Sequence, residues 1–460
     1  MNNKTLISLI LIISMSLTAG AGGIKTLGDG SSYNFERLSQ MEGSGVQKLI
    51  DEGNGKATYI LSANDTIAVG DKFQLDEGAL VRFEAGVTVV VEGEANFSST
   101  ATAYFESAFD CETLNANIRI AGQAGTTVQF ANCMFNMVGV ESVSAGALAF
   151  SDCCFLGHDG SNAAAIYFIT AGEKSIIQNC YFEECRKAAI GSSANASQAM
   201  TISECTLVKN SRDNRNIPQI NITAAEIEIQ NCQIEGDPEN HDANNMVGGI
   251  GISNFMSYSS NILISGCFIS ENRYGIGTVG PVRITIEGNQ LLNNDHEANP
   301  MNGGSGISIY DPYKQTLALI SRNRIEGNLW GVTVIGGKDV RLGKPQASDY
   351  PCEGMNVFRN NGNNGQLYDL YNNSANTVYA QNNIWGVDEQ TQELIETVIF
   401  HKADDAKLGE VVYWPAATTT GISLPSVDCQ QGREVNLGGI ATEGSKRSGI
   451  VITQGRKILR

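Results

Sequence analysis

Short segments in which apolar and polar residues alternate recur along the chain, and each ends in a polar turn. The segment IEIQNCQIEG (227–236) has this form, and so do ILISGCFISEN (262–272) and LALISRNRIEGN (317–328). Alternation with a period of two predicts β-strands with one buried face, whereas long stretches with the 3.6-residue period of helices are missing. The pattern therefore predicts an all-β protein built from repeated strands.

Aligning the repeats gives a column of Cys or Asn residues that recurs every 20 to 35 residues. A variable period with constant strand segments predicts a β-solenoid, in which each coil stacks about 4.8 Å above the last. Equivalent residues then lie over one another, and stacked Asn amides can bond from coil to coil. We therefore expect an inward structural ladder made of Cys133, Cys153, Cys180, Cys205, Cys232, Cys267, Asn289, Asn323, Asn356 and Asn383.

These repeats resemble those of the right-handed parallel β-helix superfamily, the pectate-lyase-like fold, over residues 60 to 415. The resemblance implies an all-β, right-handed parallel β-helix (β-solenoid) of about ten to thirteen coils. It leaves the activity open, because this fold hosts lyases, hydrolases, adhesins and inert scaffolds.

The two ends of the chain differ from the repeats. Lys4, an apolar stretch at 5–17 and the small residues AGA at 19–21 are typical of a signal peptide. Near the other end, Leu394 and its apolar neighbours have helical spacing, so we expect a capping helix at 388–400 with Asp388 as its N-cap. The expected organisation is a signal peptide (1–21), an N-terminal cap (22–60), the β-helix (61–386), a C-terminal cap of helix and strand (387–416), a linker (417–432) and a terminal tail (433–460).

Composition narrows the class of partner. The 460 residues carry a formal net charge of −18, and this acidic body would repel phosphate backbones, so nucleic-acid binding is not expected. No segment after the signal peptide is apolar enough to predict a membrane span. Eleven cysteines in an exported chain permit disulfides, although Cys also suits a buried inward corner. We favour buried thiols for the ladder.

A catalytic centre is not evident in the sequence. The resemblance implies that a lyase would use a Lys or Arg base beside a cation, and that a hydrolase would use clustered Asp residues. Asp152 and Glu204 are the only acidic pair in the polar column beside the ladder, two coils and so about 10 Å apart, slightly beyond the spacing of an inverting pair. They are weak catalytic candidates, and solvated turn residues are the alternative.

Ligand-binding candidates fall in two places. The loops HDANNM (241–246) and HEANPM (296–301) share a pattern, so His241, Asp242, His296 and Glu297 could together hold a cation or a sugar, unless the likeness reflects local duplication. Lys209, Arg212 and Arg215 could contact an acidic sugar, or be a solvated surface. No cofactor is evident in the sequence, and binding of a calcium ion is an open alternative. Exposed aromatic residues such as Tyr167, Tyr274, Tyr310, Tyr313 and Trp330 could stack on sugars.

The tail is basic, unlike the acidic body. Its segments GIVI (449–452) and RKIL (456–459) flank a Gly-containing turn and predict a β-hairpin. The tail resembles the C-terminal sorting segments of Bacteroidetes proteins exported by type IX secretion, although Val451 departs from that pattern. The resemblance implies contact with outer-membrane secretion machinery and a place at the cell surface, reached through the periplasm.

Two functions stay open. The first is a secreted or cell-surface β-helix protein without catalysis, acting in glycan binding or adhesion. The second is a polysaccharide lyase or glycoside hydrolase acting on an acidic glycan. The complete repeat pattern without a recognisable catalytic set favours the first.

Overall fold

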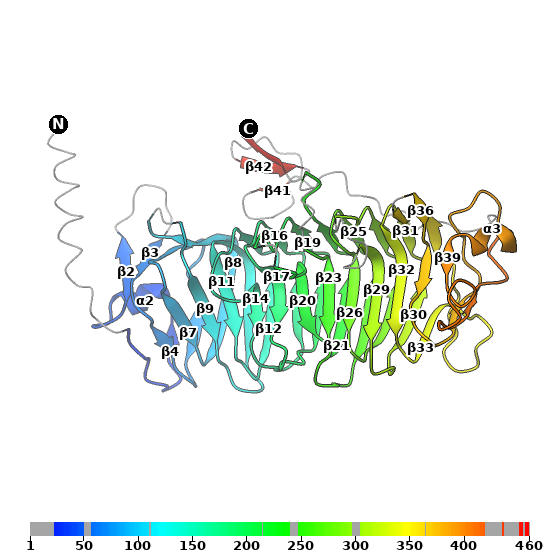
Figure 1. Cartoon of the computed structure of the whole chain (residues 1–460). Coiled ribbons are helices and arrows are strands. Elements are labelled where there is room, and N and C mark those ends of the chain that lie inside the picture. Colours follow the sequence, from blue (N-terminus) through cyan, green and yellow to red (C-terminus); the bar gives the residue numbers. More distant parts are fainter. Residues whose placement is uncertain are drawn as a thin grey trace.

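The computed structural model describes residues 23–49, 57–109, 112–213, 215–239, 247–296, 304–363 and 365–418, together with short strands at 435–436, 450–453 and 456–459. The chain winds as a right-handed parallel β-helix, with strands of successive coils side by side along a long solenoid (Figure 1). The predicted all-β solenoid is confirmed. Residues 1–21, which the sequence predicts to be a signal peptide, lie outside the described residues.

One face of the solenoid is a 13-stranded parallel sheet, called sheet A here. Its strands face the viewer in Figure 1. In chain order they are β4 (Thr66–Ile67), β7 (Thr88–Val91), β9 (Ala116–Ile120), β11 (Val138–Ser142), β14 (Ala164–Phe168), β17 (Ala188–Ser192), β20 (Ile220–Thr223), β23 (Ile250–Ser253), β26 (Ile276–Val279), β29 (Ser305–Asp311), β32 (Trp330–Gly336), β37 (Leu370–Asn372) and β39 (Ile399–Phe400).

The other two faces belong to a 25-stranded sheet, sheet B. Its first ladder is β1 (Ser32–Tyr33), β5 (Lys72–Gln74), β8 (Glu94–Ser107), β10 (Thr127–Asn136), β12 (Ala147–Ser151), β15 (Ser175–Gln178), β18 (Met200–Ser203), β21 (Glu226–Gln230), β24 (Asn261–Ser265), β27 (Arg283–Glu287), β30 (Leu317–Ser321), β33 (Asp339–Gly343), β38 (Val378–Ala380) and β40 (Val411–Val412).

The second ladder of sheet B, called the short-strand ladder here, shares β8 and β10 with the first because these two long strands cross the corner. Its further strands are β2 (Val46–Leu49), β3 (Thr58–Leu61), β6 (Leu80–Phe83), β13 (Cys154–Leu156), β16 (Tyr181–Glu183), β19 (Thr206–Val208), β22 (Gln233–Glu235), β25 (Phe268–Ser270), β28 (Gln290–Leu292), β31 (Arg324–Glu326) and β34 (Val357–Arg359). Only β2 and β3 pair antiparallel among the described strands of this sheet.

The register of the short-strand ladder stacks the Cys and Asn column. Cys154 pairs with Tyr181 and Tyr181 with Thr206, so the cysteines that precede them lie in adjacent coils, and the pairing continues to the end of the array. Each of the ten column residues is 2% exposed or less. The inward corner therefore accepts a small thiol or a hydrogen-bonded amide.

A sharp corner precedes every residue of this column. The ten residues at the corner have φ between 50° and 65°, the left-handed region that side chains other than Gly, Asn and Asp rarely adopt. They are Asn132, Asp152, Asn179, Glu204, Asn231, Gly266, Gly288, Arg322, Met355 and Asn382. The prevalence of Asn and Gly at this place follows from backbone geometry.

Aromatic stacks fill the core of the N-terminal coils. Phe105, Phe135, Phe155 and Phe182 lie over one another with ring centroids 4.4 to 5.0 Å apart and nearly parallel planes. Each Phe burial is worth about 1.5–3 kcal/mol, and stacked identical residues repeat that gain in every coil. The solenoid is thus held mainly by apolar columns.

The N-terminal end of the solenoid is covered by a short helix, α2 (Phe35–Ser39). Asn34 caps it by accepting a hydrogen bond from the backbone of Arg37. Phe35 is fully buried, with its ring 5.0 Å from that of Phe73 in the first coils. The cap thus shields apolar side chains that no further coil covers.

The C-terminal capping helix exists but is shorter than predicted. Helix α3 (Gln392–Glu396) begins after Thr391, whose hydroxyl accepts from Leu394 N, so Asp388 is not the N-cap. Ile399 belongs to β39, which pairs with β37, and Leu394 is 37% exposed. The apolar residues expected on one helix face are shared between a helical turn and a strand because the chain must rejoin sheet A.

Two antiparallel hairpins stand outside the solenoid sheets. The first joins β35 (Gly362–Asn363) to β36 (Gln366–Leu367). In the tail, β42 (Ile450–Thr453) pairs with β43 (Arg456–Leu459) and with β41 (Val435–Asn436), so the predicted terminal hairpin forms.

Candidate functional site

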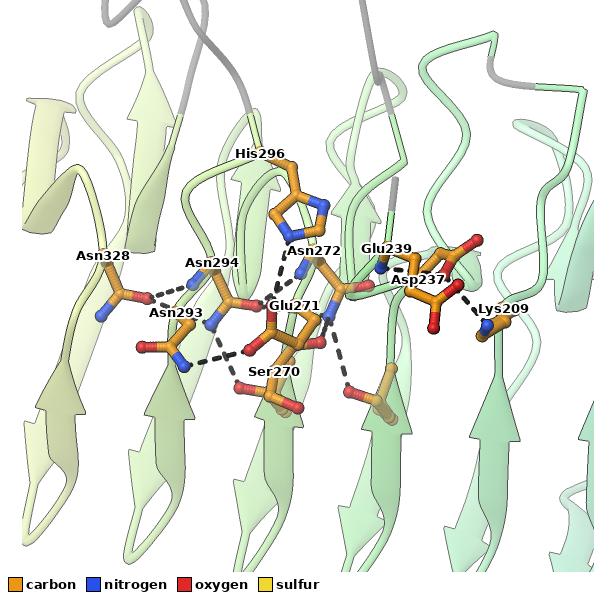
Figure 2. Close-up of polar contacts among 12 residues, drawn as sticks. Lys209, Asp237, Glu239, Ser270, Glu271, Asn272, Asn293, Asn294, His296 and Asn328 are labelled. Carbon is orange, nitrogen blue, oxygen red and sulfur yellow. Dashed lines mark hydrogen bonds and ion pairs between the residues drawn. The ribbon is translucent and has the colours of Figure 1, made fainter. Parts of the chain in front are cut away.

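A ridge of polar side chains follows the turns after the short strands of sheet B (Figure 2). We define the polar ridge as Lys209, Asp237, Glu271, Asn293 and His296. Three of its members, Lys209, Glu271 and Asn293, sit in a second left-handed corner, with φ of 52°, 56° and 52°. In this conformation their side chains stay at the surface, and the Asn that follows turns inward.

Glu271 is the centre of the ridge. His296 Nε2 lies 3.2 Å from one of its carboxylate oxygens, and Asn293 donates to the other at 3.0 Å. The His296 side chain is only 2% exposed, whereas that of Glu271 is 22% exposed. An imidazole beside a carboxylate could move a proton, although neighbours within the ridge contact both carboxylate oxygens.

The other end of the ridge is an ion pair. Lys209 Nζ lies 3.0 Å from Asp237 Oδ1, and the hydrogen bond to Asp237 raises the pKa of Lys209. Glu239 N donates to the same carboxylate oxygen at 3.2 Å. The ammonium group is therefore partly engaged within the protein and is not simply presented to a ligand.

The three predicted cationic residues do not converge. Arg212 is exposed, and Arg215 is 73% exposed with its guanidinium 4.0 Å from Asp213. Asp213 makes a closer pair with Arg186, at 2.8 Å. The separate partners of Lys209 and Arg215 argue against a single clamp for an acidic sugar.

The predicted loop pair can be placed only in part. His241, Asp242 and Glu297 lie outside the described residues, and His296 contacts Glu271, which the sequence did not suggest. Among the residues that the structure describes, no group of three or more His, Cys, Asp or Glu side chains could hold a metal ion.

Asp152 and Glu204 occupy the left-handed corner that precedes the Cys and Asn column. Asn179, in the coil between them, donates a hydrogen bond to Asp152. Glu204 is exposed at the surface. Their shared left-handed conformation gives both residues a role in the turn, so the geometry does not favour catalysis here.

Behind the polar ridge runs a second column of buried amides. Asn272 donates to Asn294 at 3.2 Å, and Asn294 to Asn328 at 3.1 Å. The chain continues through Asn361 to Asp369, which accepts at 3.0 Å. Asn272, Asn294 and Asn328 each donate to the next coil, and Asn361 donates to Asp369 of its own coil, so the column fixes the corner that displays the ridge.

Asp369 ends this column as a fully buried carboxyl group. It accepts from Asn361 on one oxygen and from Gly386 N, at 2.7 Å, on the other. Burial outweighs these two hydrogen bonds and raises the pKa of Asp369 to about 6. The C-terminal end of the solenoid thus contains a group that titrates below neutral pH.

A cluster of aromatic rings lies on the outer face of sheet A near its C-terminal end. We define the aromatic platform as Trp330, Tyr368, Tyr371 and Phe400. The Trp330 ring centroid is 4.5 Å from that of Tyr368 and 5.2 Å from that of Tyr371, with interplanar angles of 32° and 24°. Phe400 meets Tyr371 edge-on at 5.1 Å. All four side chains are half-buried, so each presents part of its ring to solvent.

Small side chains continue the platform toward the N-terminal coils. The register of sheet A aligns Tyr371 with Thr333, Ser308, Gly277 and Gly251 in successive strands. Outward positions with little or no side chain leave a shallow strip on a sheet face. Aromatic rings stand at one end of this strip.

Tyr274 lies over the same strip. Side chains added at Gly248 or Gly277 would approach its ring within 3.0 Å, which shows that the ring rests on these glycines. Burial raises the pKa of Tyr274 to about 12, so its hydroxyl stays protonated. Among the other predicted stacking residues, Tyr310 and Tyr313 are 41% and 65% exposed, and Tyr167 is half-buried on β14.

Trp330 was identified from the sequence as a stacking candidate, but Tyr368, Tyr371 and Phe400 were not. The spacing becomes irregular after β33, because long connections precede β34 and separate it from β37, the next strand of sheet A. The signal that was available is Tyr371, which follows the buried Leu370 and is placed outward by alternation; alternation does not place Tyr368 outward.

The described cysteines are all buried, and none forms a disulfide in the structure. Burial raises the pKa of the Cys185 thiol to about 12, so this thiol is protonated and unreactive at neutral pH. Six other thiols belong to the stacked column, where those of Cys153, Cys205, Cys232 and Cys267 contact backbone carbonyls of the preceding coil.

Together these features define a parallel β-helix with two surface features, a polar ridge and an aromatic platform. A scan against protein-family models finds no match, and a search of curated proteins finds no relative. Among the described residues, no helix is long and apolar enough to cross a membrane.

Solved structures with a similar course of the chain include the periplasmic alginate epimerase AlgG. Its crystal structure has a TM-score of 0.40 and 10% sequence identity, with 83% of each chain covered. Two mutants of AlgG give TM-scores of 0.40 and 0.39 at 9% and 10% identity, over 84% and 83% of this chain and 83% of theirs.

Proposed function

We propose that this protein binds a polysaccharide along the outer face of sheet A, with sugar rings resting on Trp330 and Tyr371. The aromatic platform is the observation that carries the proposal. Sugars present C–H faces that pack on aromatic rings, while the hydroxyl and indole N–H groups of Tyr and Trp supply hydrogen bonds. Half-buried rings held by one another need little ordering when a ligand arrives.

The strip of small residues supports an extended ligand. Successive coils rise by about 4.8 Å, which is close to the length of one sugar unit. A chain lying along the sheet would therefore meet equivalent positions of successive coils, from Tyr274 to the platform. Ser308, which is half-buried, would offer its hydroxyl group to the ligand along the way.

Tryptophan fluorescence tests this proposal. The protein has three Trp residues: Trp330 in the platform, Trp385 buried in the core at 1% exposure, and Trp414 on the surface at 44% exposure. Pectin, alginate, glycosaminoglycans and xylan are titrated against the protein. A glycan that binds should shift the emission of Trp330.

Matched substitutions locate the site. Trp330→Ala should weaken binding by about tenfold or more, because an aromatic side chain contributes about 1.5–3 kcal/mol when it is buried by a ligand. Trp414→Ala is the control and should leave the affinity unchanged. If no glycan binds, or if Trp330→Ala binds as tightly as the parent, the proposal is wrong.

Polysaccharide cleavage is the second candidate, and the contact of His296 with Glu271 is the observation that favours it. A lyase would produce unsaturated uronates that absorb ultraviolet light, and a hydrolase would release reducing ends. The binding proposal expects neither product from any of the four glycans. Cleavage that Glu271→Gln abolishes would assign catalysis to the polar ridge.

We further propose export by the N-terminal segment, followed by type IX-like sorting of the tail to the cell surface. The basic C-terminal hairpin supports this proposal. Deleting residues 448–460 should leave folded protein in the periplasm of the native host. If the truncated protein still reaches the surface in normal amount, the tail has no sorting role.

A further inference from the structure

An apolar patch lies on the outside of the solenoid, where polar residues are expected. We define the outer apolar patch as Met134, Cys154, Tyr181 and Val208, with exposures of 7%, 0%, 8% and 8%. Tyr104 and Leu156 pack against it. The patch lies on the short-strand ladder, where Met134 pairs with Cys154 and Cys154 with Tyr181.

These positions point away from the core. The residues that alternate with them, such as Phe155 and Phe182, are fully buried in the interior stacks. The same outward column continues through Thr206, which is half-buried, to Gln233, which is exposed. Gln290 and Val357, further along the same outward column, are also buried, at 5% and 3%, but the four neighbouring apolar or aromatic side chains that form one cluster lie between β10 and β19.

A polar group at the centre of the patch lacks a partner. The Tyr181 hydroxyl is buried, and no described residue forms a hydrogen bond with it. An unpaired buried hydroxyl costs about 1–3 kcal/mol, and a backbone or side-chain group of an occupant would remove that cost. The patch thus offers apolar contact together with one hydrogen-bonding group.

The surroundings of the patch are acidic. Burial raises the pKa of the Tyr181 hydroxyl, and the nearby negative charges of Glu183, Glu184 and Glu235 raise it further. An occupant should therefore combine apolar residues with positive charge.

The C-terminal tail of this chain has both properties. From Ala441 onward it carries Lys446, Arg447, Arg456, Lys457 and Arg460 against the single acid Glu443. Strands β42 and β43 contain the apolar residues of IVIT and RKIL between these charges.

The tail can also reach the patch. Eight coil steps separate β16 from the last coil, which is about 40 Å at 4.8 Å per step. The connecting residues 419–434 span up to about 50 Å when extended. We propose that the tail, residues 435–459, docks on the outer apolar patch of its own chain.

The proposal is independent of glycan binding at the platform. Docking would protect an apolar surface of an exported protein until the tail is withdrawn, for example by secretion machinery. The tail would then be a removable cover, and the patch the surface that its removal exposes.

A cleavable full-length protein tests the docking. A protease site is inserted between Pro425 and Ser426, and the protein is cut after folding. The fragment that contains the tail should co-elute with the solenoid at low salt and separate at about 1 M salt, where the Debye length is about 3 Å. Arg456→Glu with Lys457→Glu should release the fragment at low salt, whereas Gln233→Glu, outside the patch, should not.

Alkylation of Cys154 gives a second readout. Release of the tail should raise its alkylation rate by about tenfold or more, while Cys185 and Cys352, buried in the interior, stay protected as controls. A fragment that separates at low salt, with Cys154 equally protected before and after cutting, would overturn the proposal. So would protection of Cys154 that disappears on dilution of the uncut protein, because that result would identify a second copy as the cover.

Discussion

At the scale of single residues, the buried Asn side chains show why the array has a unique register. Asn323 donates to Asn356 at 2.9 Å and accepts from Asn289, whose backbone N–H also donates to the Asn323 side-chain oxygen. A slip of one residue would place these amides at the surface and apolar groups at the corner. The ladder therefore specifies the fold as well as stabilising it.

Replacing Asn323 with Leu should lower the free energy of unfolding by about 1–3 kcal/mol, because Asn289 and Asn356 would each lose a buried partner. Urea denaturation measures the change. Asn261→Leu, at an exposed position, is the control and should change stability by less than about 0.5 kcal/mol. Equal stability of Asn323→Leu and the parent would contradict the ladder.

The raised pKa of Asp369 predicts that the free energy of unfolding depends on pH. Burial raises its pKa to about 6 in the folded protein, above about 3.9 in the unfolded chain. Below about pH 4 the carboxyl is protonated in both the folded and the unfolded state, and its contribution to the free energy of unfolding is fully present. As the pH rises through about 6, the folded protein must bury a charge, and up to about 3 kcal/mol is lost.

Denaturation of the parent and of Asp369→Asn at pH 4 and pH 7 isolates this effect. The stability difference between the two proteins should shift in favour of the Asn variant as the pH rises. An unchanged difference would mean that Asp369 does not titrate in this range.

The Cys and Asn column could be found in the sequence because each member sits between a corner residue and a strand of constant length. The partners of Glu271 could not. His296 is 25 residues away in the next coil, and only the stacking of coils brings the two together. Likewise Asp369 follows a chain segment without repeats, so no spacing links it to Asn361.

At the scale of elements, the left-handed corners explain a polar column that resembles a catalytic row in the sequence. Glu204 has φ of 56° and is exposed. For a residue other than Gly this backbone region costs about 1–2 kcal/mol. The acidic residue is thus tolerated at a turn that favours Gly or Asn.

Substitutions at Glu204 separate the turn role from a catalytic role. Glu204→Gly should keep or raise stability, by up to about 1 kcal/mol, because the corner no longer strains a side chain. Glu204→Val should lower it by about 1–2 kcal/mol, since β-branched residues fit this region worst. Thermal unfolding measures both, and a Val variant as stable as the parent would refute the role of the corner.

Helix α3 shows the limit of periodicity for short elements. Leu394, Ile395, Val398 and Ile399 fit a helical stripe, but four positions cannot distinguish a long helix from one turn followed by a strand. Thr391 rather than Asp388 begins the helix because its extended backbone and hydroxyl reach the free N–H of the first turn.

At the scale of the whole molecule, the candidate surface features of the solenoid lie on different faces. Sheet A carries the aromatic platform, and the short-strand ladder carries the polar ridge and the outer apolar patch. The number of coils could be predicted from the sequence because strands and corners repeat. The grouping of the aromatic rings from Trp330 to Phe400 could not be predicted, because it depends on which distant strands become neighbours.

Hydrogen exchange with and without a bound glycan tests the central claim most directly. A glycan from the titration should slow amide exchange in β32 and β37, beneath the aromatic platform, and leave β25 and β28, beneath the polar ridge, unchanged. Trp330→Ala should abolish this protection at the same glycan concentration. Protection confined to the polar ridge, or protection that persists in Trp330→Ala, would contradict a glycan site on the outer face of sheet A.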